Sequence, residues 1–193
     1  MVLTIYNGKD FGSITLNWGS MYSGKTEELQ RQMRRAVFAG KKYQLFKPAK
    51  DNRYSEDEVV THYGFGLKAT VVKNAKELLE KVEKDTHVVG IDEAQFFDLD
   101  LVDVCQILKR EYHIDVVVSG LDMKFNGEPF EVTMRLAAIA DKCPKFNAVC
   151  VKCGKDAYIS HRLIRDDTDI VVGSEGVYVA LCEKHYLEEL NKE

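Results

Sequence analysis

The sequence is poor in the features that mark membrane, secreted and disordered proteins. Its 193 residues include only three prolines and no compositionally biased stretch, which argues against long disordered linkers. It contains no apolar run of about 18 residues, so we expect no membrane-spanning helix. Residues 1–11 lack the apolar core of a cleavable signal peptide. These absences predict a cytoplasmic protein with no membrane partner.

Positive charge is also in the minority. Lys and Arg number 27 against 31 Asp and Glu, which gives a net charge of −4. This balance argues against a nucleic-acid partner bound through a broad basic face, although it leaves room for a local patch. The five cysteines form an odd set without a secretion signal. They favour free thiols, some of them on a metal, over disulfides.

The periodicity of apolar residues predicts strands that alternate with helices. Strands are expected at 14–18, 42–46, 70–73, 88–91 and 116–118, and helices at 26–38, 75–84, 99–112 and 134–140. This alternation predicts an α/β fold with a parallel sheet and right-handed crossovers over residues 1–143. Beyond Cys143, short apolar runs lie between cysteine pairs and polar loops. They predict a small β-rich lobe over residues 144–193.

A phosphate-binding motif follows the first expected strand and opens the first expected helix. It comprises Gly19, Ser20, Met21, Tyr22, Ser23, Gly24, Lys25 and Thr26. In such a P-loop the backbone N–H groups turn inward at phosphate oxygens, Lys25 reaches the β- and γ-phosphates, and the Thr26 hydroxyl helps to hold Mg²⁺. The alternative is a chance glycine turn, which the position between a strand and a helix disfavours.

Two acidic residues end the expected strand at 88–91. Asp92 occupies the place from which a carboxylate completes the magnesium site of P-loop proteins. Glu93 is then available either to polarise a water molecule or to accept a proton from a hydroxyl. A solvent-exposed acidic strand end is the alternative, and the nearby P-loop makes it the weaker one.

Two short pairs of metal ligands lie near the C-terminus, Cys150-x-x-Cys153 and Cys182-x-x-His185. Each pair can bind one metal from a tight turn, and together they fill the four positions of a structural zinc site. The alternative is that these cysteines are buried or incidental. Cys105 lies in an expected helix and is predicted to be a core residue.

Further candidates follow other strand ends. Aromatic side chains after the strands at 88–91 and 116–118, in Gln95-Phe96-Phe97 and from Phe125 to Phe130, could stack a flat base or pack in the core. In Lys47-Pro48-x-x-Asp51-x-Arg53, the last two residues could face phosphates. The residues alone favour a solvated turn there.

Five motifs in this order resemble the thymidine kinases found in bacteria, in some viruses and in the animal cytosol. They are the P-loop, Lys47–Arg53, Asp92–Phe97, Gly120–Phe130 and the cysteine pairs, and the resemblance covers about residues 12–186. It implies a RecA-like sheet flanked by helices, with a zinc-ribbon-like β lobe and a lasso-like loop over the nucleoside. His185 stands where many relatives carry cysteine, and histidine binds zinc equally well.

The resemblance also implies a reaction and its residues. The γ-phosphoryl group of ATP would pass to the 5′-hydroxyl of thymidine, and of deoxyuridine, with Glu93 as general base and Lys25 and Arg53 as catalytic charges. Asp51, Asp92 and Gln95 would join the P-loop in binding ATP and Mg²⁺. The nucleoside would contact Met21, Phe96, Leu121, Phe125, Phe130, Ser160, Val171 and Tyr178. Relatives imply a homotetramer that is inhibited by thymidine triphosphate.

Other functions predict other features. A P-loop ATPase or nucleic-acid motor would use a zinc ribbon to grip DNA, and would need a basic, aromatic stripe on that ribbon. Between residues 150 and 176 acidic residues balance the basic ones, which disfavours this function. A scaffold that merely binds nucleotide would keep the fold and would be indifferent to the loss of Glu93.

Overall fold

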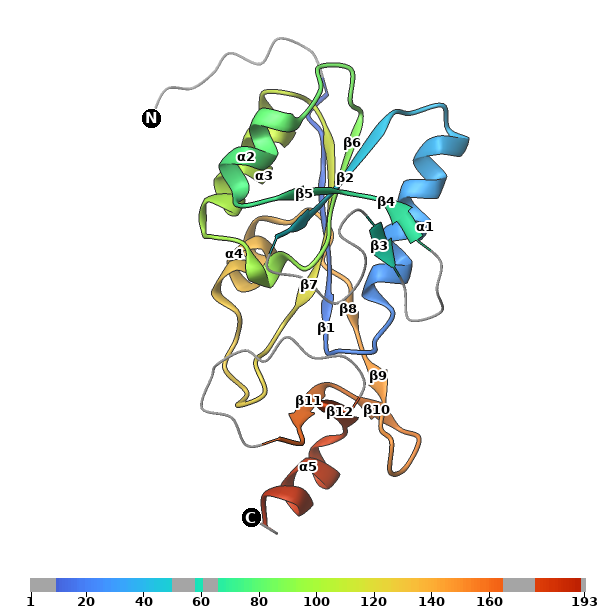
Figure 1. The fold of residues 1–193 in the computed structure, drawn as a ribbon, viewed down its shortest axis with the longest axis vertical. Coiled ribbons are helices and arrows are strands. Elements are labelled where there is room, and N and C mark those ends of the chain that lie inside the picture. Colours follow the sequence, from blue (N-terminus) through green and yellow to red (C-terminus); the bar gives the residue numbers. More distant parts are fainter. Residues whose placement is uncertain (1–9, 50–57, 61–65, 165–175, 192–193) are drawn as a thin grey trace.

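The computed structural model describes residues 10–49, 58–60, 66–164 and 176–191, and shows an α/β fold around one parallel sheet (Figure 1). The six strands of this sheet follow the order β5-β2-β6-β7-β1-β8. Their bounds are β1 (Ile14–Gly19), β2 (Tyr43–Pro48), β5 (Thr70–Val72), β6 (Val88–Ile91), β7 (Asp115–Leu121) and β8 (Lys145–Phe146). Every neighbouring pair is parallel, which confirms the predicted fold class.

Helices cover both faces of the sheet. Helix α1 (Lys25–Phe38) lies on one face, and α2 (Ala75–Lys81), α3 (Asp100–Arg110) and α4 (Glu131–Ile139) lie on the other (Figure 1). Leu29 and Met33 of α1 pack with Val117 of β7 in one buried cluster. Leu101 and Leu108 of α3 belong to the larger cluster on the opposite face. Burial on both faces explains why the strands are continuous apolar runs.

The element bounds differ from expectation at a few places. Helix α2 ends at Lys81 instead of residue 84, because Val82 has extended backbone angles. Helix α4 begins at Glu131, three residues before the expected start, directly after the extended Phe130. Strand β8 was not expected, since it has only two residues. A short antiparallel pair, β3 (Glu58–Val60) and β4 (Gly66–Lys68), was also not expected.

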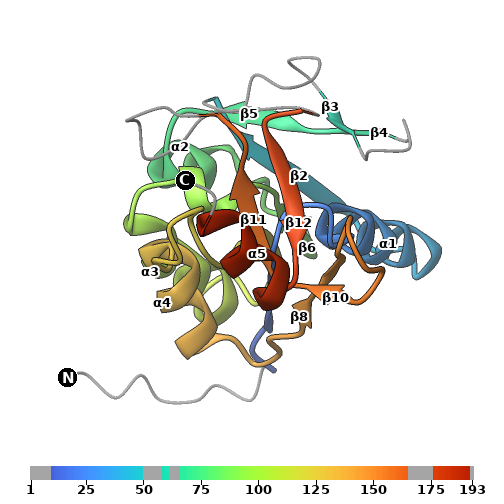
Figure 2. The same cartoon turned by 90° about the horizontal axis from the view of Figure 1, so that it is seen from below.

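The C-terminal lobe is built from two small antiparallel sheets and a helix. Strand β9 (Ala148–Val149) pairs with β10 (Asp156–Ala157), and β11 (Ile159–Arg162) pairs with β12 (Tyr178–Leu181). Helix α5 (Glu183–Leu190) lies over β11 and β12 (Figure 2). The lobe is rich in strands, as expected, but α5 was not expected. The apolar run at 170–172 lies outside the described residues, and the proposed boundary at residue 143 stays a prediction.

The buried centre of this lobe is small. It consists of Ala148, Cys150, Ala157, Ala180 and Leu181. Tyr22 of the P-loop packs against this cluster from outside the lobe. A core made largely of alanine and cysteine side chains buries little apolar area, so a lobe of this kind depends on additional cross-links.

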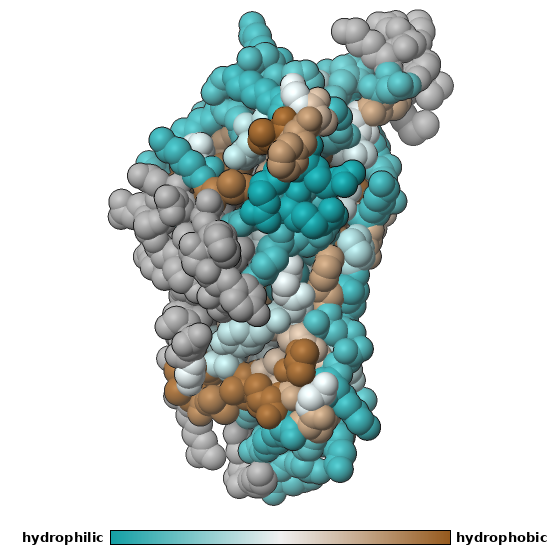
Figure 3. Space-filling view, turned by 90° about the vertical axis from the view of Figure 1, so that its right-hand side faces the viewer, coloured by the Kyte–Doolittle hydropathy of each residue, from teal (hydrophilic) through white to brown (hydrophobic). Residues whose placement is uncertain are grey.

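The surface over α1 is mainly hydrophilic, while apolar atoms gather in a band across the lower part of the molecule, toward the lobe (Figure 3). Exposed apolar side chains of the lobe include Val149, Val151, Leu163 and Ile164.

Within the described part of the chain, no helix combines the length and the apolar character needed to cross a lipid bilayer.

Candidate functional site

The P-loop makes a tight turn between β1 and α1. Gly24 adopts a left-handed conformation with φ of 84° immediately before α1, and Tyr22 has φ of 62°. At Gly19, with φ of 146°, a Cβ atom would lie 2.0 Å from the carbonyl oxygen of Phe146. Only glycine fits this position, because β8 runs directly against the end of β1. The Ser23 hydroxyl closes the turn by donating to the Ser20 carbonyl oxygen at 2.7 Å.

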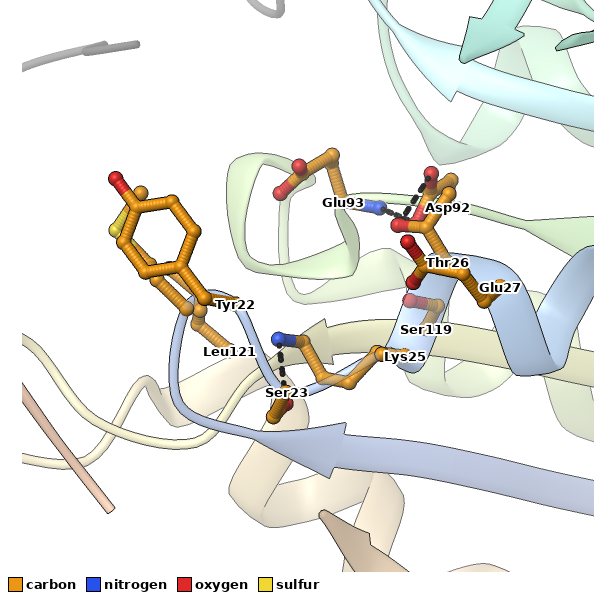
Figure 4. A pocket seen from close by; sticks show the side chains of 11 residues that line it. Tyr22, Ser23, Lys25, Thr26, Glu27, Asp92, Glu93, Ser119 and Leu121 are labelled. Atoms are coloured by element: carbon orange, nitrogen blue, oxygen red, sulfur yellow. Dashed lines mark hydrogen bonds between the residues drawn. The ribbon is translucent and has the colours of Figure 1, made fainter. Parts of the chain in front are cut away.

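Two residues at the start of α1 point into the space that the loop encloses (Figure 4). The Lys25 ammonium donates to the carbonyl oxygen of Ser20 and to the hydroxyl of Ser23, at 3.3 Å from the latter. Thr26 Oγ1 lies 3.3 and 3.4 Å from the two carboxylate oxygens of Asp92. The threonine of the motif and the acid at the end of β6 therefore meet, although 66 residues separate them.

Glu93 occupies a constrained position beside this pair. Its φ of 52° is in the left-handed region, which non-glycine residues rarely adopt, and its backbone N–H donates to Asp92 Oδ1 at 3.0 Å. Its carboxylate accepts a hydrogen bond from the side-chain amide of Gln95. Gln95 follows within the single 3₁₀ turn η1 (Ala94–Phe96). Strained backbone conformations of this kind cluster at active sites and ligand-binding sites, so the conformation of Glu93 supports a functional role.

One pocket brings the sequence candidates together (Figure 4). Its lining comprises Met21, Tyr22, Ser23, Gly24, Lys25, Thr26, Glu27, Asp92, Glu93, Ser119 and Leu121. Glu27 and Ser119 were not among the predicted residues. Ser119 is 1% exposed, lies within β7 beside β1 and directly follows the apolar run at 116–118, which is the sequence signal that marks it. The arrangement sets the Lys25 ammonium, several hydroxyl groups and the three carboxylates of Glu27, Asp92 and Glu93 around a space at the carboxyl ends of three strands.

The candidates for nucleoside binding lie next to this pocket and around the lobe. Leu121 and Met21 line the pocket itself, and Phe130 is buried at the start of α4. Phe96 and Phe125 are half-buried. Asp51, Arg53 and Val171 lie outside the described residues.

Phe125 and Arg162 form a contact that the sequence did not indicate. The Arg162 guanidinium of β11 lies 3.6 Å from the centre of the Phe125 ring. The face of an aromatic ring attracts a cation that lies over it, because the ring carries partial negative charge there. The segment after β7 is therefore attached to the C-terminal lobe at this point.

The P-loop is hydrogen-bonded to the C-terminal lobe through three consecutive residues. The Ser20 hydroxyl donates to the Ala157 carbonyl oxygen at 3.2 Å. The Met21 backbone N–H donates to Ser160 Oγ at 3.0 Å. The Tyr22 hydroxyl donates to the Tyr178 carbonyl oxygen at 3.3 Å. Two of the nucleoside candidates, Ser160 and Tyr178, therefore hold the phosphate loop.

The four predicted metal ligands are brought together in the lobe. The ligand atoms of Cys150, Cys153, Cys182 and His185 all lie within 4.8 Å of one another. The Sγ atoms of Cys153 and Cys182 are 3.8 Å apart, and His185 Nδ1 is 3.3 Å from the Sγ atoms of Cys150 and Cys182. Zinc–sulfur bonds of about 2.3 Å in a tetrahedron place sulfur atoms about 3.8 Å apart, so the set fits zinc.

The pKa values of two thiols of the cluster shift in opposite directions. A hydrogen bond from the Lys155 backbone lowers the pKa of Cys153, but burial and the neighbouring thiols of Cys150 and Cys182 outweigh it, so that pKa is raised. Burial opposes ionisation of the Cys150 thiol, but hydrogen bonds from the backbone of Cys182, Lys152 and Cys153 lower its pKa to about 5. The thiolate is the form that binds metal. Four protein ligands leave no open position for a catalytic water, so this site is suited to a structural role.

Cys105 is a core residue, as predicted. It is fully buried in α3, and burial raises the pKa of its thiol to about 12. A thiol held in its neutral form acts as a small apolar side chain.

Comparison with known proteins assigns the chain to a family. The family model "Thymidine kinase" matches residues 12–186. A thymidine kinase of Bacteroides thetaiotaomicron is 46% identical over 176 residues, covering 91% of this chain and 87% of that protein. One of Bacteroides fragilis is 44% identical over 182 residues, covering 94% and 90%. The genome packaging NTPase B204 of Sulfolobus turreted icosahedral virus 2 aligns over 71% of this chain and 75% of its own, at 15% identity and a TM-score of 0.47. The family model that matches residues 12–186, together with these two Bacteroides enzymes, shows that this chain belongs to the thymidine kinase family.

Proposed function

We propose that this protein is an ATP-dependent thymidine kinase, which transfers the γ-phosphoryl group of ATP to the 5′-hydroxyl of thymidine and of deoxyuridine. The family supports this activity. The observation that carries the mechanism is the placement of Glu93 beside the Thr26–Asp92 pair in one pocket with Lys25. Phosphoryl transfer requires positioning and charge neutralisation more than covalent chemistry from the protein, and this pocket offers both.

The phosphate side of the reaction is assigned to the P-loop. Its backbone N–H groups and the start of α1 favour negative charge, and the Lys25 ammonium would leave Ser20 and Ser23 for the β- and γ-phosphates. Thr26 and Asp92 offer the adjacent oxygen ligands that suit Mg²⁺. When bound there, Mg²⁺ would neutralise the negative charge that develops on the phosphates during transfer.

Glu93 is assigned the role of general base. Its carboxylate takes the proton of the 5′-hydroxyl while the 5′-oxygen forms a bond to the γ-phosphorus and the bond to ADP breaks. The hydrogen bonds from Gln95 to its side chain and from its own N–H to Asp92 fix this carboxylate relative to the magnesium ligand. Arg53 and Asp51 are proposed to supply supporting charges.

The nucleoside is proposed to bind between the main sheet and the C-terminal lobe. Met21 and Leu121, which line the pocket at the P-loop, would form the floor of this site. Phe96, Phe125, Phe130 and Tyr178 would supply the aromatic walls, and Ser160 and Val171 would contribute from the lobe. Aromatic faces suit a flat pyrimidine because stacking needs no hydrogen-bond pattern on the protein side.

Zinc in the Cys–His cluster is proposed to hold this lobe in shape. The small alanine-rich centre of the lobe is the reason, since a closed metal site adds the cross-link that such a core lacks. A homotetramer and inhibition by thymidine triphosphate are proposed from the family alone.

The first test is product detection with Mg·ATP and four nucleosides: thymidine, deoxyuridine, deoxycytidine and deoxyadenosine. We expect thymidine and deoxyuridine monophosphates in large excess over the other two products. Release of ADP that depends on added DNA, with no nucleoside monophosphate, would instead support a nucleic-acid motor. Nucleotide binding without any turnover would support a scaffold.

A further inference from the structure

Gln95 is a buried glutamine, and both polar atoms of its side-chain amide have defined hydrogen-bond partners. It is 6% exposed, its Oε1 accepts from the backbone N–H of Leu121 at 2.9 Å, and its Nε2 donates to a carboxylate oxygen of Glu93. The partners fix which way the amide points. A backbone N–H can only donate, so Oε1 must face Leu121, and an ionised carboxylate can only accept, so Nε2 must face Glu93.

The anchor on the other side of Gln95 is itself rigid. Leu121 is the last residue of β7, and its carbonyl oxygen accepts from the Thr133 hydroxyl of α4 at 2.7 Å. The packing at Gly120 is tight, because a Cβ there would lie 2.7 Å from Thr133 Cγ2 and 3.3 Å from Gln95 Oε1. Gln95 therefore rests on a strand end that a helix and a close backbone approach hold in place.

We propose that Gln95 is a positioning residue for Glu93, rather than a ligand of ATP or Mg²⁺ as the resemblance to thymidine kinases implies. It does not line the pocket formed by the P-loop, and both of its polar atoms are directed at protein groups. Its amide sets the direction of the Glu93 carboxylate from the strand end that also carries Leu121. A small misplacement of a reacting group can lower the rate about 10²-fold, so such a contact matters to turnover. The inference rests on the proposed role of Glu93 as base.

Two substitutions distinguish the hydrogen bond to Glu93 from the hydrogen bond to Leu121. Gln95→Met removes both bonds at similar side-chain length. Gln95→Glu keeps an acceptor for the Leu121 N–H but replaces the donor that faces Glu93 with an oxygen. If Gln95 positions the base, we expect both variants to lower kcat about 10-fold or more. The KM for ATP and the Kd for thymidine should stay within about threefold of the wild-type values.

A matched control is Gln44→Met. Gln44 also joins separate elements, since its amide donates to the Lys81 carbonyl oxygen at 3.1 Å and accepts from the Glu83 backbone N–H at 2.8 Å. It lies at the opposite end of the sheet from the pocket, near the start of β2. We expect this variant to lose thermal stability and to keep the wild-type kcat. A comparable loss of kcat would attribute the effect at Gln95 to general destabilisation and overturn the proposal.

The decisive measurement is a double-mutant cycle with Glu93→Gln. A residue that acts through Glu93 loses its effect once Glu93 is replaced, so Gln95→Met should change kcat by less than about twofold in that background. Additive losses would overturn the positioning role. Wild-type kcat in Gln95→Glu would also overturn it, as would a rise in the KM for ATP without a change in kcat. Gln95→Glu serves in the same cycle if Gln95→Met does not fold.

This experiment keeps the two hypotheses apart. If Glu93→Gln alone turns over normally, the assignment of the base is wrong, whatever Gln95 does. If Glu93→Gln is slow and Gln95→Glu is as fast as wild type, the base assignment stands and only the role of Gln95 fails.

Discussion

The backbone N–H of Met21 donates to Ser160 Oγ at 3.0 Å, which joins the phosphate loop directly to the C-terminal lobe. Ser20 and Tyr22, on either side of Met21, make their own bonds to carbonyl oxygens of the lobe. Tyr22 holds this contact from a left-handed backbone conformation, with φ of 62°. The shape of the P-loop therefore depends on the shape of the lobe, and the two proposed substrate sites share one structural support.

For this reason, zinc removal should weaken the binding of the nucleotide as well as that of the nucleoside. A chelator is expected to raise the KM for both ATP and thymidine by about 10-fold or more before the main sheet unfolds, because Ser20, Met21 and Tyr22 are hydrogen-bonded to the lobe that the proposed zinc would stabilise. Steady-state kinetics with far-ultraviolet circular dichroism on the same samples measures both effects. An unchanged KM for ATP in the zinc-free protein would contradict the coupling.

Cysteine variants supply the matched pair for this prediction. Cys153→Ser removes one ligand of the cluster, and Cys143→Ser changes an exposed cysteine outside it. We expect a stoichiometric metal assay to find about one zinc per chain in the wild type and in Cys143→Ser, and much less in Cys153→Ser. Absence of zinc from the purified wild-type protein would rule out the structural metal site.

Replacement of Glu93, the proposed base, should separate substrate binding from turnover. Glu93→Gln keeps the size of the side chain and its contact with Gln95, so thymidine and ATP should still bind. Turnover should fall about 10²-fold or more, because the amide cannot take the proton of the 5′-hydroxyl. Isothermal titration with thymidine tests whether binding is retained, and single-turnover kinetics test whether turnover falls. Near-normal turnover would remove Glu93 from its role.

Local motifs explain why the pocket could be predicted from the sequence. Lys25 and Thr26 follow from a contiguous pattern, and Asp92 and Glu93 follow from the position of an apolar strand. In a parallel sheet the carboxyl ends of strands meet at one edge, so these separate motifs had to converge. The four residues of the Cys–His cluster follow from two short spacings in the same way.

The contacts between motifs were not predictable in this way. The bond from Met21 to Ser160 depends on how the lobe packs against the main sheet, for which no local signal exists. The role of Gln95 depends on Leu121, which comes from a different strand. Strand β8 was missed because pairing with β1, and not an apolar run, makes it a strand.

Gly19→Ala is expected to be far more damaging than a similar change in an open turn. The new methyl group would lie 2.0 Å from the Phe146 carbonyl oxygen, in a backbone conformation that alanine disfavours. The combined clash and strain should cost more than about 3 kcal/mol of unfolding free energy. Gly127→Ala is the control, since Gly127 also has a positive φ of 84° but nothing lies within 4 Å of the added Cβ. Its cost should be about 1–2 kcal/mol by urea unfolding; equal losses would refute the close approach of β8.

The Asp141 carboxylate should make stability depend on pH in acid. Lys109, whose ammonium lies 2.7 Å away, and the Ile14 backbone N–H, also at 2.7 Å, lower the pKa of Asp141. A carboxyl group with a lowered pKa in the folded state stabilises the fold above its unfolded value of about 3.9 and loses that contribution as the pH falls through the folded value. Asp141→Asn keeps an acceptor for Ile14 but loses the charge that faces Lys109.

Because the Asp141 side chain is 42% exposed, solvent screening limits the loss at pH 7 to about 1 kcal/mol. The difference between wild type and variant should shrink below about pH 4, where Asp141 begins to take up a proton in the unfolded chain, and should continue to shrink as the pH falls through the lowered folded value. Urea unfolding of both proteins between pH 7 and pH 3 measures this convergence. Asp10→Asn, at an exposed aspartate near the start of the described chain, should leave stability unchanged across the same range. A difference between wild type and Asp141→Asn that stays constant down to pH 3 would show that the carboxylate acts through packing and not through its charge.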